Sequence, residues 1–600
     1  MEIGASTPQQ EYSRRLEASL KIAANKERLH IWAGNLKVFS ILVGLAVGWL
    51  SLARLLISPY WLAIPVGFFV ILLIAHERIL QSESWAKRVA SFYQRGIERI
   101  EDRWAESGEP GERFIDGKSC YSEDLDLFGP GSLFQLISTA RTRMGEDCLA
   151  KWLLSPSTIP AIIERQNLVK ELKEKLELRE RLAVIGEDLR VTLDPDALIR
   201  WAEGEVVLQS RFLRWSSATL AALALATLTL WGIAGISLPF FAVLLLEIIY
   251  MLLLQKRAKA TLNGLDCDLR GLVLFTQILE VIEQEEFSSS RLQGFVSKLK
   301  NSGLTAARSM RRLARVADWV EARDSYIVKI IDLPTLFTLQ LGFAANAWRQ
   351  RWGADVRAWI EAAGEVEALL SLTTYAYEHP DDPFPSFTEG VNSQPVFDGE
   401  DLGHPLIPST RCVCNSVRLG EDARVLLVSG SNMSGKSTLL RCVGINTVLA
   451  LAGAPVRAKC LRLTPLVIGS SIRSSDSLQD GRSRFYTEIL RIRQVFGLAE
   501  SGLPVLFLFD ELLEGTNSED RRMGAEGLIR AFMGHAAIGL ITTHDLAITE
   551  ISKSFEASVR NVHFQESIEG GKMIFDYKLR DGVVKTSNAL ELMRLIGLKA

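Results

Sequence analysis

The sequence has little excess of either charge and few cysteines. Its 68 Lys and Arg residues against 71 Asp and Glu residues give a formal net charge of −3. A basic coat for nucleic acid is therefore absent, and any DNA contact must come from a local patch. The seven cysteines form no CxxC pair, which excludes a disulfide framework and a zinc ribbon and fits a reducing cytoplasm. The first residues are polar and lack an apolar run, so we expect no signal peptide.

The chain is long and more apolar than an ordinary soluble protein. Its 600 residues are about four times the usual domain length, so we expect several domains. Hydrophobic residues (48%) and charged residues (23%) occur at globular levels, which excludes a disordered or collagen-like chain. The mean hydropathy of +0.14 is nevertheless high for a soluble protein of this size. Two long apolar stretches account for the excess.

Each apolar stretch is predicted to form two membrane-crossing helices joined by a short turn. The first pair covers residues 38–57 and 60–75, and the second covers residues 216–236 and 238–254. A bilayer core needs about 20 apolar residues, so these lengths are adequate or slightly short. Lys and Arg flank both pairs and are missing from the turns, so both hairpins should enter from the cytoplasm and return to it. We therefore expect a multi-pass protein of a bacterial-type inner (cytoplasmic) membrane; the alternative is two buried helical pairs of a soluble core.

Two charged residues interrupt these segments. Arg54 lies near the far end of its predicted helix, where its side chain can extend to the membrane interface. Glu247 lies in the middle of its predicted helix, where an unpaired charge is costly. The carboxyl group is either protonated or paired with Arg54, and the sequence leaves both open.

The stretches of roughly 79–210 and 260–375 show helical periodicity, with apolar residues recurring every three or four positions. One segment carries Arg308, Arg311, Arg312 and Arg315. A basic helix face of this kind either meets phosphates or is simply solvated, and solvation is the commoner case. A Pro- and Asp-rich boundary follows at residues 379–390, and short strands with glycine turns begin after it.

A phosphate-binding motif lies in this C-terminal part. An apolar strand at residues 425–428 leads into Gly430-x4-Gly435-Lys436-Ser437 and then into a helix, which is the setting of a P-loop. Backbone N–H groups and the helix N-terminus would surround the phosphates, Lys436 would reach the β- and γ-phosphates, and Ser437 would bind Mg²⁺. The predicted ATP-binding residues are Gly430, Ser431, Asn432, Met433, Ser434, Gly435, Lys436, Ser437 and Thr438.

Two further strands are predicted to deliver catalytic side chains to the same site. The apolar run at residues 505–509 ends in Asp510 and Glu511; Asp510 would hold Mg²⁺ through water, and Glu511 would polarise the attacking water. A third strand at residues 536–546 carries His544 at its end, where it would sense or stabilise the γ-phosphate. The alternative for His544 is an ordinary surface histidine after a strand.

At these residues the chain resembles the MutS family of DNA mismatch-repair ATPases. The P-loop residues 431–434 are similar to that family's proline-asparagine-methionine-glycine segment, with serine at the first and last positions. Residues 474–490 resemble a second family motif, through Asp476, Leu478, Gly481, Ser483, Phe485 and Glu488. The resemblance implies that Ser483 reaches across a dimer to the partner's γ-phosphate. Thr543-His544 matches the family's sensor pair, whereas Leu513-Glu514 replaces a usual glycine-arginine.

The resemblance covers about residues 120–210 and 260–600 and implies the rest of the architecture. The family's adenine-stacking aromatic residue would fall near Cys412, which leaves the base contact open. Residues 586–598 resemble the C-terminal helical segment that completes the family's dimer interface. The family's N-terminal mismatch-reading domain has no room here, so mismatch recognition by intercalation should be missing.

The predicted fold is an α/β P-loop NTPase domain (ABC-type ATPase, MutS-like) plus an all-α lever and core domain with two transmembrane helical hairpins. The predicted divisions are 1–36, an amphipathic cytoplasmic segment; 37–77, hairpin 1; 78–210, helical core; 211–257, hairpin 2; 258–380, helical lever; and 390–600, the ATPase domain with C-terminal dimerisation helices.

The predicted activity is ATP hydrolysis by a homodimer that uses ATP and Mg²⁺ in two composite sites. One hypothesis is an ATP-switched, membrane-anchored protein that binds DNA in a mismatch-repair-like or other DNA-processing role. The alternative is a mechanical or regulatory membrane ATPase that acts on a protein partner and has no DNA role. An ABC-type transporter is disfavoured because the chain has no LSGGQ-like signature and its four apolar segments have almost no polar lining.

Overall fold

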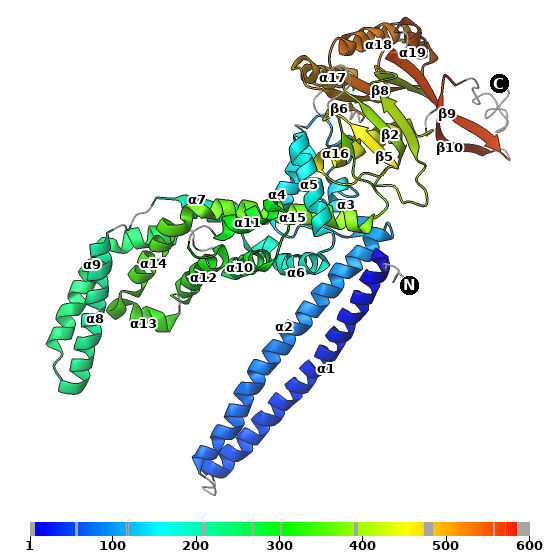
Figure 1. The fold of residues 1–600 in the computed structure, drawn as a ribbon. Helices are drawn as coiled ribbons and strands as arrows, with labels where there is room; N and C mark the ends of the chain where they lie inside the picture. The colour runs from blue at the N-terminus through cyan, green and yellow to red at the C-terminus, as the bar shows by residue number, and fades with distance from the viewer. Residues whose placement is uncertain are drawn as a thin grey trace. The chain divides into compact units, whose positions relative to one another are not determined.

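The computed structural model describes most of the 600 residues. The described ranges are 7–53, 58–115, 117, 119–205, 208, 210–263, 265, 269–300, 303–323, 325–388, 394–431, 433–472, 484–555, 558–569 and 572–584. They divide into two compact units (Figure 1), one formed by Met1–Gly108 with Tyr377–Pro380 and the other by Glu109–Ala376 with Asp381–Ala600.

The first unit is a long antiparallel pair of helices, α1 (Pro8–Gly48) and α2 (Ala63–Ile100). Thr7 and Gln10 form a capping box that fixes the start of α1. The expected boundary at residue 36 falls inside α1, because the polar N-terminal segment and the apolar segment form one helix. At one end of the pair the Arg99 guanidinium makes two hydrogen bonds to the buried Glu378 carboxylate, at 2.6 and 2.7 Å. Arg54 lies outside the described residues.

The second unit begins with a helical part. Its helices are α3 (Leu133–Ile137), α4 (Arg143–Leu154), α5 (Ile159–Leu172), α6 (Leu176–Thr192), α7 (Pro195–Glu203), α8 (Arg211–Ala234), α9 (Leu238–Leu262), α10 (Leu269–Gln284), α11 (Ser290–Lys300), α12 (Ala306–Ala322), α13 (Tyr326–Thr335), α14 (Phe337–Trp352) and α15 (Val356–Glu378). The hairpin of α8 and α9 turns at Gly235, whose φ of +72° favours glycine at this helix end. The predicted helical character of this part is confirmed.

The unit ends in an α/β part with two sheets. Its elements are β1 (Ser386–Phe387), β2 (Phe397–Leu402), β3 (Asn415–Leu419), β4 (Val425–Ser429), α16 (Lys436–Ala452), β5 (Cys460–Leu463), β6 (Val467–Ser471), α17 (Arg484–Glu500), β7 (Val505–Phe509), α18 (Ser518–Met533), β8 (Ala537–Thr543), α19 (Leu546–Thr549), β9 (Val559–Glu569) and β10 (Lys572–Asp581). The larger sheet has the order β10-β9-β4-β8-β7-β6, and the smaller has the order β1-β5-β2-β3. In the larger sheet only β10 is antiparallel to its neighbour.

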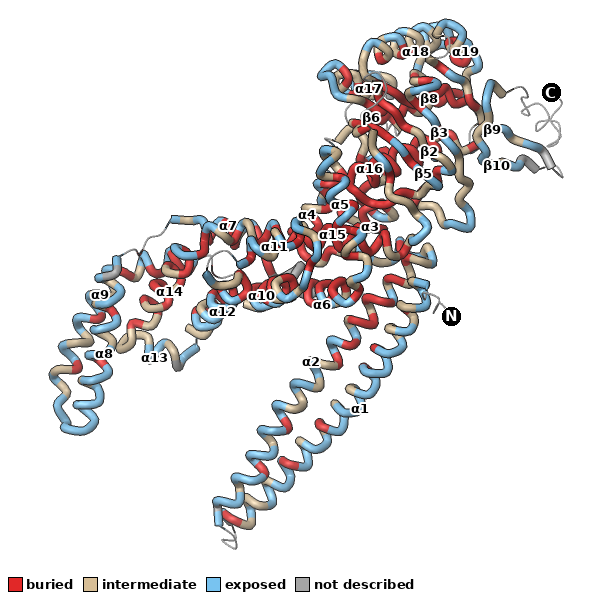
Figure 2. The backbone as a smooth tube through the Cα atoms, in the orientation of Figure 1, coloured by how far each residue is buried: buried red, intermediate tan, exposed pale blue. Residues whose placement is uncertain are grey.

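The core of the α/β part lies between the larger sheet and the helices α17 and α18. Phe507 and Phe509 of β7 stack on each other, and both rings pack at a tilt against Phe532 of α18 in a cluster of buried side chains. Strands β4, β7 and β8 are buried along their whole length, as expected for parallel strands covered on both faces. Figure 2 shows this for β8. Helix α16 meets the helical part closely, since a Cβ on Gly444 would lie 2.6 Å from Leu125.

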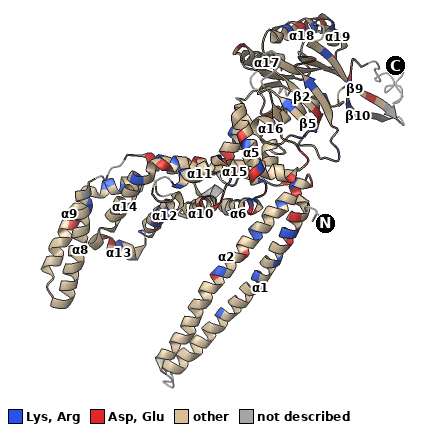
Figure 3. Cartoon of the chain, viewed as in Figure 1, with Lys and Arg blue, Asp and Glu red and all other residues tan. Residues whose placement is uncertain are grey.

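Within the described ranges, four helical stretches are long and apolar enough to cross a membrane. They are Pro8–Leu52, Tyr60–Ile100, Phe212–Ala234 and Leu238–Leu262. A fifth arises if the bent pair Val328–Thr335 and Phe337–Glu378 is counted as one span. Between Arg214 and Lys256, α8 and α9 expose large apolar side chains and no charged one, and Figure 3 shows the ends of both hairpins nearly free of charge. Length and composition are therefore compatible with the two predicted hairpins.

Candidate functional site

The predicted site residues follow three neighbouring parallel strands. Val428 and Ser429 of β4 pair with Thr542 and Thr543 of β8. On the other side of β8, Ile541 pairs with Phe509 of β7. Because the carboxyl ends of parallel strands meet at one edge of a sheet, the residues that follow them come together there. The strand–loop–helix order predicted around residue 430 is confirmed, as are the predicted strands that precede Asp510 and His544.

The loop at residues 430–435 has the features of an anion cradle. Gly435 has a φ of +102° and starts α16, and a Cβ at Gly430 would lie 2.8 Å from the Ser434 hydroxyl. The Ser434 hydroxyl is buried and has no hydrogen-bond partner among the described residues. Glycine backbone, an orphan hydroxyl and the N-terminus of a 17-residue helix together fit a phosphate group.

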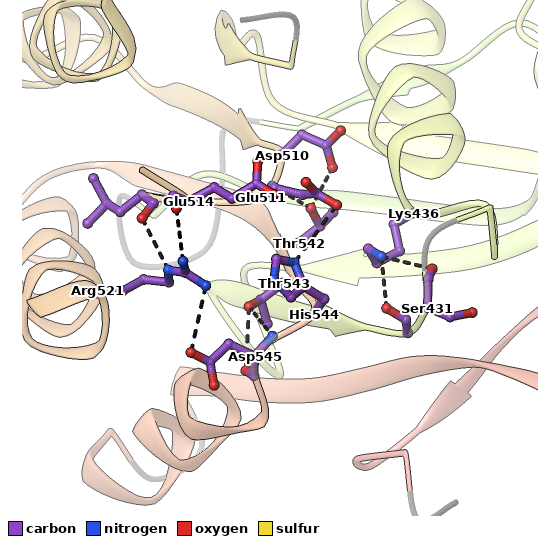
Figure 4. A network of polar contacts seen from close by, with 12 residues as sticks. Ser431, Lys436, Asp510, Glu511, Glu514, Arg521, Thr542, Thr543, His544 and Asp545 are labelled. Carbon is purple, nitrogen blue, oxygen red and sulfur yellow. Dashed lines mark hydrogen bonds and ion pairs between the residues drawn. The ribbon is translucent and has the colours of Figure 1, made fainter. Parts of the chain in front are cut away.

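Lys436 is buried beneath this loop. Its side-chain ammonium donates to the carbonyl oxygens of Gly430 at 2.8 Å and Ser431 at 2.9 Å (Figure 4), and the residue is only 4% exposed. Burial lowers the pKa of the ammonium, and the carboxylates of Glu511, Asp510 and Glu566 oppose that shift. The positive charge is therefore already held at the loop that would receive the phosphates.

Thr542 joins the two acidic residues, and no sequence motif had singled it out. Its hydroxyl donates to Oδ1 of Asp510 and accepts from the backbone N–H of Glu511 at 2.8 Å (Figure 4). Asp510 also donates its backbone N–H to the carbonyl of Ser471, at 2.9 Å. The sequence signal for Thr542 was a polar residue near the end of a predicted buried strand. Its partners Glu511 and Asp510 could not be predicted, because they lie 31 and 32 residues away and meet Thr542 only through the pairing register of β7 and β8.

Glu511 lies between a histidine and a second carboxylate. Its Oε1 is 4.0 Å from Nδ1 of His544, and one ligand atom from each of Glu511, Glu514 and His544 lies within 4.8 Å of the others. Burial raises the pKa of Glu511, and the nearby charge of Glu514 raises it further, while Lys436 and His544 oppose the shift. A carboxylate with a raised pKa beside a phosphate cradle has the chemistry of a general base.

The loop after Glu511 is fixed by two side chains from neighbouring helices. Leu513 has a φ of +56° and donates its N–H to Oε1 of Glu488, at 2.7 Å. The Arg521 guanidinium donates to the carbonyl oxygens of Leu513 at 3.1 Å and Glu514 at 2.9 Å. Arg521 thus binds the backbone of the loop directly (Figure 4), and no sequence motif had identified it. The strained turn that orients Glu511 is therefore held from α17 and α18.

A cavity of about 790 Å³ opens beside the cradle. Its walls come from residues 402–415, the loop at 430–439 and the β9–β10 pair, and include Leu402, His404, Leu406, Ile407, Pro408, Arg411, Cys412, Val413, Asn415, Ser431, Met433, Gly435, Lys436, Ser437, Thr438, Leu439, Cys442, Glu511, Phe564 and Tyr577. Asp510 and His544 are not among these lining residues. The volume suits a nucleotide-sized ligand.

Tyr577 supplies an aromatic face to this cavity, although the resemblance had placed the base contact near Cys412. The Tyr577 ring is 44% exposed and lies next to Gly435, whose added Cβ would be 3.2 Å from the ring. Asn415 holds this position by donating to the Tyr577 carbonyl at 2.9 Å and accepting from Leu579 N–H at 2.7 Å. Cys412 also lines the cavity but offers no ring. Sequence reasoning missed Tyr577 because it lies 162 positions beyond Asn415, the nearest residue of that wall in the chain.

Asp124 links the helical part to the strand that leads into the second motif. It accepts hydrogen bonds from Ser470 Oγ at 2.7 Å and Ile472 N–H at 3.0 Å, and it pairs with Arg491 at 3.3 Å. Several predicted residues lie outside the described residues: Asn432, Asp476, Leu478, Gly481, Ser483 and the segment 586–598. Their roles remain predictions.

Comparison with known families and proteins gives consistent matches. The family model of MutS domain V matches residues 426–600, and that of MutS domain III matches residues 122–316. The α/β part with the candidate site thus corresponds to domain V, and much of the helical part to domain III.

Curated relatives agree with this assignment. The DNA mismatch repair protein MutS of Staphylococcus saprophyticus is 27% identical over 321 residues, which is 52% of this chain and 35% of the relative. The protein of the same name from Staphylococcus carnosus is 26% identical over 326 residues, 52% of this chain and 36% of the relative. That of Staphylococcus aureus strain JH9 is 31% identical over 291 residues, 47% of this chain and 32% of the relative. The chain thus spans about a third of the length of these relatives. On the strength of the two matched domains and these relatives, the chain belongs to the MutS family.

Proposed function

We propose that the candidate site binds and hydrolyses ATP. The observation that carries the proposal is the meeting of Lys436, Glu511 and Thr542 at one edge of the sheet, beside a glycine cradle and a nucleotide-sized cavity. Lys436 would release the loop carbonyls and bind phosphate oxygens. Glu511, with its raised pKa, would take the proton of the attacking water, and His544 would stabilise the γ-phosphate.

Ser437 and Asp510 would hold Mg²⁺ at this site. Ser437 lines the cavity in the first turn of α16, and Asp510 follows β7 with Oδ1 bound by Thr542. Hydroxyl and carboxylate oxygens are the donors that Mg²⁺ takes in proteins. The ion would supply charge neutralisation on the phosphate oxygens. The protein's own part is to hold Asp510 in a fixed direction through Thr542.

Two variants test the site. Lys436→Ala should abolish ATP binding, because it removes the cation that the loop holds. Glu511→Ala should leave ATP binding intact and stop hydrolysis, which traps the ATP-bound state. ATP binding and phosphate release by the purified full chain are the measurements. Normal hydrolysis by Glu511→Ala would refute the role given to that carboxylate.

We further propose that the active form is a homodimer with two composite sites, in which ATP closes the dimer and hydrolysis opens it. Each site would take Lys436, Glu511 and His544 from one subunit and Ser483 from the other. Neither Ser483→Ala nor Lys436→Ala homodimers should hydrolyse ATP. A mixture of the two should regain one working site per mixed dimer. Failure of the mixture to regain activity, with mixed dimers present, would contradict a shared site.

The two hairpins are proposed as membrane anchors of a protein in a bacterial-type inner membrane, with the α/β part in the cytoplasm. Large apolar side chains are exposed all along them, such as Phe39 and Leu42 of α1 and Leu245, Leu252 and Leu253 of α9. An exposed apolar surface of this extent is unstable in water and favourable in lipid. Carbonate washing of membranes tests the anchor: the protein should stay with the vesicles, and release into the wash would contradict the proposal.

The target of the ATP-driven movement is proposed to be DNA, because the curated relatives are DNA mismatch repair proteins. A second candidate is a mechanical or regulatory membrane ATPase with a protein partner and no DNA role. The contacts of two arginines in the basic segment 308–315 favour this second candidate: Arg311 pairs with Glu280, and Arg312 lies over the Trp352 ring at 5.7 Å. These arginines are therefore engaged within the chain. Salt-dependent DNA binding by the solubilised protein separates the two, since absence of binding at low salt removes the DNA role.

A further inference from the structure

Helix α13 exposes a row of large apolar side chains. Tyr326 is 88% exposed and Ile330, one turn on, is 78% exposed, with Ile331 beside it. The polar groups of the helix are directed to local partners. Asp332 accepts from the N–H and the hydroxyl of Thr338, at 2.7 and 2.8 Å, and Lys329 lies over the Tyr326 ring at 5.9 Å. The outer face of α13 is therefore apolar and has no cover among the described residues.

This face lies at the basic-flanked end of the α8–α9 hairpin. Helix α13 contacts both α8 and α9 (Figure 1). At its end, Leu336 packs in one cluster with Leu254 and Ala258 of α9, and Gln340 donates to Ser217 of α8 at 3.2 Å. Ser217 and Leu254 lie at the beginning and the end of the second predicted membrane-crossing pair, residues 216–236 and 238–254. The face of α13 is therefore level with the membrane boundary of the proposed anchor.

Exposed aromatic side chains gather at the same level. Phe212 and Trp215 in the first turns of α8 are 78% and 73% exposed, and Trp319 near the end of α12 is also exposed. Trp319 packs edge-on against Phe337, the first residue of α14, with ring centroids 5.7 Å apart. Tryptophan and tyrosine are enriched where a membrane protein meets the headgroups. Together with Tyr326 these rings make an aromatic belt around this end of the hairpin.

The direction of α13 also fits a membrane surface. Pro334 and Leu336, whose φ is +50°, end α13, and the helical stretch Phe337–Glu378, which begins with α14, is bent by 77° from Val328–Thr335. That helix, α14, packs closely on α9, since a Cβ on Gly342 would lie 3.2 Å from Cβ of Ala258. Figure 1 shows α14 running alongside α9 and α13 running across both, which is the direction of a helix close to the membrane plane. Figure 2 shows α13 as exposed and intermediate residues beside α8.

We propose that α13 is an interfacial helix that lies in the boundary between headgroups and acyl chains of the bilayer crossed by α8 and α9. The proposal rests on the membrane anchor proposed above. An apolar face of this kind sinks about 5–10 Å into that boundary. The lever helices α12 and α14, which flank α13, are then tied to the membrane surface as well as to the spanning hairpin.

Quenching by spin-labelled lipids tests the depth of α13 in the full chain. The protein, with its seven native cysteines replaced by alanine, is labelled with an NBD fluorophore at Ile330→Cys and reconstituted into phosphatidylcholine vesicles. The vesicles carry a nitroxide either on the headgroup or near the end of the acyl chain. Leu225→Cys, on the exposed surface of α8, reports on the anchor, and Arg308→Cys, exposed at the far end of α12, is the matched control.

At Ile330→Cys the headgroup nitroxide should remove a larger fraction of the NBD emission than the acyl-chain nitroxide. The order should be reversed at Leu225→Cys, and neither lipid should quench Arg308→Cys. Quenching at Leu225→Cys with none at Ile330→Cys would overturn the interfacial helix and leave the anchor standing; a protein covering this face would give that result. Stronger quenching of Ile330→Cys by the acyl-chain nitroxide would also overturn it. Absence of quenching at Leu225→Cys would overturn the anchor itself.

Discussion

Replacing Thr542 with valine removes one hydroxyl from the candidate site and keeps the shape of the side chain. Thr542 is fully buried, and its hydroxyl donates to the Asp510 carboxylate while it accepts from Glu511 N–H. A hydrogen bond to a charged group contributes about 1.5–3 kcal/mol, and an unpaired N–H adds a further penalty of about 1 kcal/mol where water can partly replace the partner. We therefore expect a local loss of about 2.5–4 kcal/mol.

Two assays read this loss. If this loss of hydrogen bonding raises the activation free energy of hydrolysis by about 1.4 to 2.8 kcal/mol, kcat falls about 10- to 100-fold, and KM for ATP changes less. Hydrogen exchange, read by mass spectrometry on a peptide that spans residues 508–513, should show faster exchange of the Glu511 amide. The exchange assay needs no catalytic activity, so it tests the hydrogen bond independently of the proposed function.

Two neighbouring variants serve as controls. Thr542→Ser keeps the hydroxyl and should restore both slow exchange and most of kcat. Thr543→Val, at the next position of β8, removes a hydroxyl that accepts from Asp545 N–H at 3.0 Å and has no contact with the acidic pair. Unchanged exchange and turnover in Thr542→Val, or equally fast exchange of the Glu511 amide in the two valine variants, would refute the reasoning.

Three further predictions follow from other contacts. Tyr577→Ala should weaken binding of a fluorescent ATP analogue about 10- to 100-fold, because base stacking contributes about 1–3 kcal/mol, whereas Tyr577→Phe should bind normally. Glu514→Gln should shift the acid limb of the kcat/KM profile to lower pH, because it removes a like charge that raises the pKa of Glu511, whose ionised form is the active one. Glu378→Ala should lower the stability of the first unit by about 3–5 kcal/mol, because it leaves Arg99 buried without its partner; thermal unfolding measures this.

Each of these has a result that contradicts it. Equal affinity of the alanine and phenylalanine variants would remove the stacking role of Tyr577. An acid limb at the wild-type pH in Glu514→Gln would mean that another group is titrated. The exposed pair of Arg357 and Glu203 provides the control for the third: Glu203→Ala should leave the thermal unfolding temperature close to that of the wild type. Equal effects of Glu378→Ala and Glu203→Ala would show that burial does not matter at this pair.

The local parts of the site could be predicted because each is encoded in a short run of residues. An apolar run followed by glycines and Lys436 predicts strand, loop and helix, and a buried run that ends in Asp510 and Glu511 predicts a strand that delivers carboxylates. The hairpins could be predicted in the same way from the length of their apolar runs. The length of α1 could not be predicted from the sequence, because its polar and apolar halves differ in composition and yet form one helix.

The sequence by itself therefore determined the chemistry available at the sheet edge, the existence of two apolar hairpins and the membership of a family. Only the tertiary structure decided that Thr542 orients both acidic residues, that Arg521 holds the loop and that Tyr577 faces the cavity. It also decided that α13 leaves its apolar face beside α8. The physical reason is the same in each case. Strand register and helix crossing bring together residues that are distant in the chain, and no pattern within a short window encodes those pairings.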